Sequence, residues 1–328
     1  MVTDQLRALV RRYPLIRFAT RRIRVRLPRR LGGLDPDRVP PWTREVVLSL
    51  PRLESDTRRI GPDDLTLRLP GDLTVPRRLA AFGLARHEPD SLACFMAMLD
   101  HTRPGAVFDV GSGVGVYSLL AAARTRRPVF AFEPTPEVAA AARAVSSSAD
   151  LGFTVVELAL SNHTGTAHLR RARHNDMCNT LVRSARADLS HITVRVTTLA
   201  RWNEDASAFP TVLKIDTVGT EPDVVAGGLE VLRRYRPWML VKVRPDRGLE
   251  ERLMALLDPL EYTWYPVSGP PPYEPRPEIS GRASPAWERM WLFTPEPVPE
   301  EFWPSVRGWR RALESCRPGS RGNARGPS

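Results

Sequence analysis

A short apolar segment followed by evenly spaced glycines limits most strongly what this chain can fold into. Residues 106–110 are apolar apart from one aspartate, which is typical of a buried parallel strand. An apolar, alanine-rich helix is predicted shortly afterwards, over residues 117–123. Glycine permits a tight turn from strand to helix and lets a ligand lie against the backbone. The nicotinamide pattern G-x-G-x-x-G does not fit, because its last glycine is replaced by Val116. The glycines between strand and helix are Gly111, Gly113 and Gly115.

A second apolar strand that ends in an acid lies in register with this turn. Residues 129–132 precede Glu133 and Pro134, and Glu133 stands eighteen residues after Gly115. In dinucleotide-type folds an acid about 20 residues beyond the glycines binds the ribose hydroxyls. A carboxylate can accept both hydrogen bonds of a vicinal diol, so the pattern predicts a ribose on Glu133. The alternative is a surface glutamate before a turn.

Hydropathy argues against a membrane-spanning protein, and the cysteine content argues against a disulfide-rich or zinc-binding one. No apolar run reaches the roughly 18 residues that a membrane span needs, and the N-terminus carries many arginines without an apolar signal-peptide core. We therefore expect a cytoplasmic protein with no integral membrane segment. The three cysteines are widely spaced, which favours neither a disulfide framework nor a zinc site.

The positive charge is concentrated at the two ends of the chain. The net charge is +11, to which residues 1–60 contribute +9, residues 302–328 contribute +5 and the intervening part contributes −3. An enzyme that acts on nucleic acid more typically carries its basic face beside the site, so we expect no nucleic-acid partner. Only two of the 48 basic residues are lysine, Lys214 and Lys242, and both lie near the ends of predicted strands.

Strands and helices alternate along the middle of the chain, which predicts an α/β fold with a mostly parallel sheet and helices on both faces. Such sheets bind ligands at the carboxyl ends of their strands. The predicted strands are residues 106–110, 129–133, 154–159, 168–173, 193–197, 212–216, 238–243, 262–267 and 289–294, and the predicted helices that follow residue 130 are 136–147, 221–235 and 249–257.

Three parts are expected. They are a basic helical extension and linker over residues 1–60, a Rossmann-like domain over 61–296 and a C-terminal tail over 297–328 whose end we expect to be disordered. The apolar alternation around Pro70 and Gly71 predicts a hairpin over residues 65–75. The proline-rich loop 268–285, which contains Tyr273, is interpreted either as an acceptor lid or as a rigid connector.

The order of these motifs resembles the FkbM-family methyltransferases. The resemblance covers about residues 92–245, and it implies a class I methyltransferase fold, S-adenosylmethionine as cofactor and usually O-methylation of a small metabolite, sugar or polyketide hydroxyl. The matching segments are Phe108-Asp-Val-Gly-Ser-Gly-Val-Gly, Phe132-Glu-Pro, Ala159-Leu-Ser-Asn with Gly165, Leu213-Lys-Ile-Asp with Gly219 and Glu221, and Val225-Ala-Gly-Gly.

The resemblance assigns roles to individual positions. Glu133 would bind the ribose, and Ser161 and Asn162 would border the adenine. Asp216, at the end of the fourth strand, would face the transferring methyl group and the acceptor. The methionine portion of the cofactor would be held by Asp109, Gly111, Gly113 and Gly115. Tyr117 and Pro134 complete the predicted cofactor site. The predicted catalytic residues are Asp216, Lys214, Glu221 and Lys242.

Three positions depart from the family pattern. Val218 replaces a glutamate, Ala200 stands where an acid usually follows the strand at 193–197, and Lys242 replaces the acid that ends the fifth strand. Lys242 has two interpretations: it binds an anionic acceptor, or it neutralises Asp216 and weakens it as a base. A site that has lost acids is a poor metal site, so no metal is expected.

O-methylation requires a base that removes the hydroxyl proton. Asp216 is the first candidate, and His163, His174 and His191 on predicted loops are its rivals. We therefore expect an O-methyltransferase with a small-molecule acceptor. The alternative is a protein that binds the cofactor without transferring methyl and acts as a partner or regulator through its basic ends.

Overall fold

The computed structural model describes residues 43–53, 63–71, 73–149, 151–170, 181, 191–244, 248–280 and 289–316. Several predictions fall outside these ranges: the basic helix in the N-terminal extension, His174 with nearly all of its loop, and the disordered C-terminal end.

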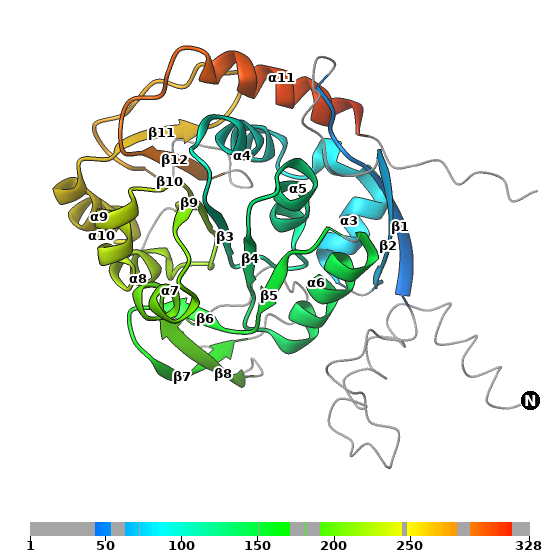
Figure 1. Cartoon of the computed structure of the whole chain (residues 1–328), viewed down its shortest axis with the longest axis horizontal. Helices are drawn as coiled ribbons and strands as arrows, with labels where there is room; N and C mark the ends of the chain where they lie inside the picture. Colours follow the sequence, from blue (N-terminus) through cyan, green and yellow to red (C-terminus); the bar gives the residue numbers. More distant parts are fainter. Residues whose placement is uncertain are drawn as a thin grey trace, which may run out of the picture.

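A seven-stranded sheet forms the centre of the protein (Figure 1). Neighbouring strands pair in parallel except at β12, which is antiparallel to both of its neighbours. The mostly parallel sheet predicted from the sequence is thus confirmed. In spatial order the strands are β11 (Thr263–Val267), β12 (Met290–Thr294), β10 (Trp238–Lys242), β9 (Pro210–Ile215), β3 (Ala106–Val110), β4 (Val129–Phe132) and β5 (Thr154–Val156).

The strand order reverses beside β3. The chain runs outward from β3 through β4 to β5, and then crosses to the other side of β3, where it continues through β9 and β10. Open α/β sheets bind their ligands at such a switch point, in the crevice outside the carboxyl ends of the strands. The glycine turn after β3 and Asp216 after β9 therefore meet at the same edge of the sheet.

Helices cover both faces of the sheet, as expected. Alternate residues of β3 point to opposite faces, so Val107 belongs to one apolar core and Phe108 to the other. One face is packed by α4 (Pro89–His101), α5 (Val116–Arg124), α6 (Pro136–Ala149) and α11 (Phe302–Ser315), and the other by α7 (Leu199–Ala206), α8 (Glu221–Ala226), α9 (Leu229–Tyr235) and α10 (Leu249–Leu257). Helix α3 (Thr74–Phe82) shares the apolar core of the first face and packs against β1 (Thr43–Ser49) of a separate two-stranded sheet.

Two predicted elements are interrupted. The strand expected over residues 154–159 ends at Val156, and β6 (Ala159–Ser161) joins a separate three-stranded sheet with β7 (Gly165–Arg170) and β8 (His191–Thr198). The helix expected over residues 221–235 is broken at Gly227 and Gly228. A Cβ atom on Gly227 would lie 2.0 Å from the carbonyl oxygen of Ser161, so the break lets the chain pack closely against β6.

The hairpin predicted over residues 65–75 is wrong. Strand β2 (Asp64–Pro70) pairs instead with β1 (Thr43–Ser49), and the chain after Gly71 enters α3. The alternation of apolar residues in β2 fits a strand, as predicted, but the partner strand lies upstream, within the part expected to be a helical extension and linker. At the other end of the chain, α11 packs against α4, so this part of the expected tail is ordered structure.

Candidate functional site

An open cavity of about 950 Å³ lies at the switch point of the sheet. The wall includes the glycine turn after β3, the residues that follow β4 and the loop that follows β9. Among the lining residues are Gly113, Tyr117, Glu133, Pro134, Lys214 and Asp216.

The glycines of the turn meet different surroundings. All three have positive φ angles, of 72° at Gly111, 57° at Gly113 and 84° at Gly115. A Cβ atom on Gly111 would lie 2.0 Å from the backbone oxygen of Asp216, whereas one on Gly113 would meet no atom within 4 Å. Gly111 thus brings the turn close to β9, and Gly113 leaves its side of the cavity open to a ligand.

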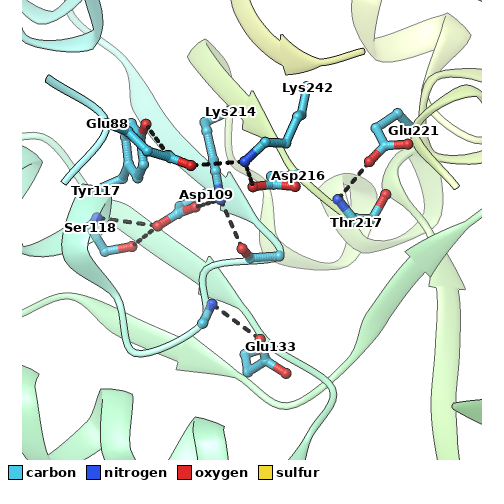
Figure 2. Close-up of polar contacts among 12 residues, drawn as sticks. Glu88, Asp109, Tyr117, Ser118, Glu133, Lys214, Asp216, Thr217, Glu221 and Lys242 are labelled. Atoms are coloured by element: carbon cyan, nitrogen blue, oxygen red, sulfur yellow. Dashed lines mark hydrogen bonds and ion pairs between the residues drawn. The ribbon is translucent and has the colours of Figure 1, made fainter. Parts of the chain in front are cut away.

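Glu133 is held against the glycine turn by backbone N–H groups. Gly113 N–H donates to Oε2 (3.1 Å) and Thr135 N–H donates to Oε1 (2.8 Å), so the carboxylate lines the cavity in a fixed orientation (Figure 2). Burial raises the pKa of Glu133 to about 7, although these hydrogen bonds and Lys214 act in the opposite direction. The carboxyl therefore changes charge near neutral pH.

Asp109 and Lys214 lie beneath the turn and support it. Asp109 is fully buried and accepts hydrogen bonds at Oδ2 from the N–H (3.2 Å) and hydroxyl (2.8 Å) of Ser118. Lys214 Nζ lies 2.9 Å from Asp109 Oδ1 and donates to the carbonyl oxygen of Gly111 (2.8 Å). Asp109 does not line the cavity. It anchors the start of α5 to the end of β3.

Lys242 bridges two carboxylates at the opposite end of the site from Glu133 (Figure 2). Its Nζ lies 2.9 Å from Asp216 Oδ2 and 2.9 Å from Glu88 Oε1. The hydroxyl of Tyr117 donates to the other oxygen of Glu88 at 3.1 Å. The bridge therefore joins β10, β9, α5 and the residue that precedes α4.

The bridge controls the ionisation of both carboxylates. Burial raises the pKa of Asp216, but Lys242, Lys214 and Arg244 outweigh it, so the pKa is lower than usual. Burial also raises the pKa of Glu88, but Lys242 and His87 together outweigh it, so this pKa is lowered as well. Asp216 thus faces the cavity as an ion-paired carboxylate with little basicity. Of the two interpretations of Lys242, this geometry matches neutralisation of Asp216.

Glu221 shapes the loop after β9 and does not line the cavity. It is buried and accepts hydrogen bonds from the N–H groups of Thr217 (3.0 Å) and Gly219 (2.9 Å). These contacts close the loop that carries Val218. Burial raises the pKa of Glu221, and the nearby Asp216 adds to this effect.

Val218, which replaces a family glutamate, has a left-handed backbone with φ of 61° and lines the cavity. A β-branched residue is strained there, at a cost of about 1–3 kcal/mol.

We expect Val218→Asn to raise the free energy of unfolding by about 1 kcal/mol, since asparagine tolerates this conformation. Urea denaturation would measure the change. Val155→Asn, at a half-buried valine in β5, is the matched control and should destabilise the protein; a loss of stability in both variants would contradict strain at Val218.

The predicted adenine residues lie outside the cavity. Ser161 is buried in β6, and Asn162 is exposed, with its amide 3.4 Å from Asp223. The cavity wall is formed instead by the residues just before them, Leu158 to Leu160. The histidines proposed as bases, His163 and His191, are exposed and also do not line it.

Among the cavity-lining residues that the sequence did not predict, two are ionisable, His87 and Glu88. They precede Pro89 at the start of α4 and belong to no motif, so only the packing of α4 over the site reveals them. Glu88 has a left-handed backbone (φ 48°), which ends the preceding turn and directs its carboxylate to Lys242.

The residues that the structure describes contain neither a metal-binding cluster nor a membrane-spanning helix. No group of three or more histidine, cysteine, aspartate or glutamate side chains there could hold a metal ion. In the same part of the chain, no helix has the length and hydrophobicity to cross a membrane.

Comparison with protein families gives one match. Residues 109–262 match the model of the methyltransferase FkbM domain, which covers the glycine turn, Glu133, Asp216 and Lys242. Among curated proteins none matches significantly.

Solved structures resemble the chain at low identity. A methyltransferase FkbM from Methylobacillus flagellatus matches with a TM-score of 0.36 and 14% identity over 58% of this chain and 43% of that chain. A precorrin-6y C5,15-methyltransferase from Geobacter metallireducens matches with a TM-score of 0.37 and 12% identity, over 62% of this chain and 85% of that chain. A SAM-dependent methyltransferase from Agrobacterium tumefaciens matches with a TM-score of 0.37 and 12% identity, over 74% of this chain and 72% of that chain. This chain thus spans less than half of the first of these structures, and scores at this level add nothing to the family match.

Proposed function

Because residues 109–262 form an FkbM-family methyltransferase domain in a class I methyltransferase fold, we propose that the protein transfers a methyl group from S-adenosylmethionine to a hydroxyl of a small molecule. The observation that carries this proposal is the open cradle at Gly113, which faces the carboxylate of Glu133 in one cavity with Asp216.

The residues present fit the cofactor. Gly113 leaves space where any side chain would project, and Glu133 can accept hydrogen bonds from the two ribose hydroxyls. Leu158 and Leu160 offer an apolar wall to a base. When bound, the cofactor supplies a methyl group on a positively charged sulfur, and the carbon–sulfur bond breaks with its electron pair left on sulfur as the acceptor oxygen attacks.

The charges around Asp216 favour an uncharged acceptor. Both lysines of the site are paired, Lys214 with Asp109 and Lys242 with Glu88 and Asp216. The bridge of one ammonium and two carboxylates has a net charge of about −1, so it would repel a carboxylate or phosphate group. An acceptor with a neutral hydroxyl, such as a sugar or polyketide alcohol, suits this site better than an anionic one.

Cofactor binding should depend on the ionisation of Glu133. Only the carboxylate accepts hydrogen bonds with both oxygens, and its pKa of about 7 places the change near neutral pH. Affinity for S-adenosylmethionine should fall by up to about tenfold per pH unit below this value and level off above it. Titration calorimetry from pH 6 to pH 8.5 would measure this dependence.

Glu133→Gln tests the assignment. The variant should bind about 10- to 100-fold more weakly at pH 8, through loss of about 1.5–3 kcal/mol of charge-assisted hydrogen bonding, and should show no dependence on pH around 7. NADH serves as the control ligand and should not bind. A folded protein that binds neither S-adenosylmethionine nor its demethylated product would overturn the proposed function.

The ion-paired state of Asp216 favours a second function. A carboxylate neutralised by Lys242 is a weak base, as expected of a protein that binds the cofactor without using it. Tight cofactor binding, with no demethylated product formed across a wide panel of neutral and anionic hydroxyl compounds, would favour this alternative.

A further inference from the structure

The imidazole of His87 lies in the cavity wall with a buried nitrogen that lacks a hydrogen-bond partner. His87 is 5% exposed, and its Nδ1 atom has no partner among the residues that the structure describes. The hydroxyls of Ser112 and Thr217 in the same wall are also unpaired. Of these three side chains, only the imidazole takes up a proton near neutral pH.

The other titratable side chains of the described wall are already engaged. Each one has a hydrogen bond or an ion pair that fixes it to the protein. They are Glu88 with Lys242 and Tyr117, Glu133 with Gly113 and Thr135, Lys214 with Asp109 and Gly111, and Asp216 with Lys242. His87 is the remaining titratable side chain of this wall, and its Nδ1 atom has no such contact with a described residue.

The surroundings of His87 keep its ring neutral. Burial lowers its pKa, and the charges of Arg78, Lys242 and Lys214 lower it further, while the adjacent Glu88 raises it. A neutral imidazole can accept a proton at neutral pH. Once it is protonated, the neighbouring carboxylate of Glu88 stabilises the imidazolium.

We propose that His87 is the catalytic base that removes the proton of the acceptor hydroxyl. This assignment rests on the proposed function and names a residue of the same site. As the acceptor oxygen gains the methyl group, its proton passes to a ring nitrogen of His87, which becomes an imidazolium and later releases the proton to water. The acceptor leaves as a neutral methyl ether, so atoms and charges balance.

Nuclear magnetic resonance of the protein with its cofactor tests this assignment without knowledge of the acceptor. A base within about 3 Å of the acceptor oxygen, itself about 3 Å from the methyl carbon, must lie near the cofactor methyl group. With S-adenosylmethionine that carries a ¹³C-labelled methyl group, we expect a nuclear Overhauser effect between that methyl and the ring protons of His87. The ring ¹⁵N shifts should show a neutral imidazole at pH 7.5.

Two variants complete the test. His87→Asn identifies the ring signals, and it should bind the cofactor as wild type does while methyl transfer to hydroxyl acceptors is slowed by about 100- to 10,000-fold. His168→Asn, at an exposed histidine of β7, should change neither binding nor transfer. Absence of cofactor binding by wild type would overturn both proposals. Cofactor binding with no contact between the methyl and His87, or with an imidazolium at pH 7.5, would overturn only the assignment of His87.

Discussion

Gly111→Ala is expected to lower the free energy of unfolding by about 3 kcal/mol or more, the sum of left-handed backbone strain and overpacking. The new Cβ atom would lie 2.0 Å from the backbone oxygen of Asp216. In addition, the φ angle of 72° at position 111 disfavours any residue with a side chain. That oxygen belongs to the backbone that continues β9, so it cannot move aside as a flexible side chain could. Thermal and urea denaturation would measure the loss.

Gly113→Ala is the matched control, because it adds the same methyl group two residues away. Its φ angle is also positive, at 57°, but no atom lies within 4 Å of the new Cβ atom. We expect a loss of about 1–2 kcal/mol from backbone strain alone and a large loss of cofactor affinity, since the methyl group projects into the cradle. Equal stability losses in the two variants would contradict the assignment of Gly111 to packing and Gly113 to binding.

Lys242→Met is expected to destabilise the protein by about 3 kcal/mol at pH 7.5, because it removes the ammonium that separates two partly buried carboxylates. In wild type the pKa values of Asp216 and Glu88 are lowered, mainly by Lys242 against the effect of burial. Without it, burial and mutual repulsion should raise both pKa values above those of the unfolded chain. The variant should therefore lose stability as pH rises through these values.

The sign of this dependence separates the bridge from ordinary packing. The deficit of Lys242→Met relative to wild type should be larger at pH 7.5 than at pH 5, because protonation at low pH relieves the repulsion in the variant. Adding Glu88→Gln to Lys242→Met should recover part of the loss at pH 7.5. A deficit that does not change with pH would mean that the aliphatic stem of Lys242, and not its charge, stabilises the site.

The bridge also explains how a family acid can be replaced by lysine without leaving an unpaired charge. The end of β10 lies beside Asp216 and opposite Glu88, so an acid at position 242 would bring three carboxylates together. Lys242 instead satisfies two of them, and Tyr117 satisfies the remaining oxygen of Glu88. Under the assignment proposed above, His87 and not Asp216 takes the proton of the acceptor.

Local patterns were sufficient for the central sheet and the glycine turn. An apolar strand, three glycines and an acid at the next strand end constrain the backbone within about 30 residues, and the structure places these parts as expected. The pairing of a strand with a partner far away in the chain could not be predicted from local patterns. The apolar alternation of β2 fits an upstream or a downstream partner equally well, and only the packing of β1 against it decides between them.

The sequence by itself determined the α/β class, the strands that carry the glycine turn and Glu133, and the resemblance of residues 109–262 to the methyltransferase FkbM domain. These features depend on residues close together in the chain, whose spacing limits the backbone. Only the tertiary structure decided which charges are paired and which polar groups are left without a partner. His87 and Glu88 stand more than 120 positions before Asp216 and Lys242, and no pattern in the chain links them. They meet because α4, which packs on one face of the sheet, begins beside the end of β10, where burial favours the pairing of each charge.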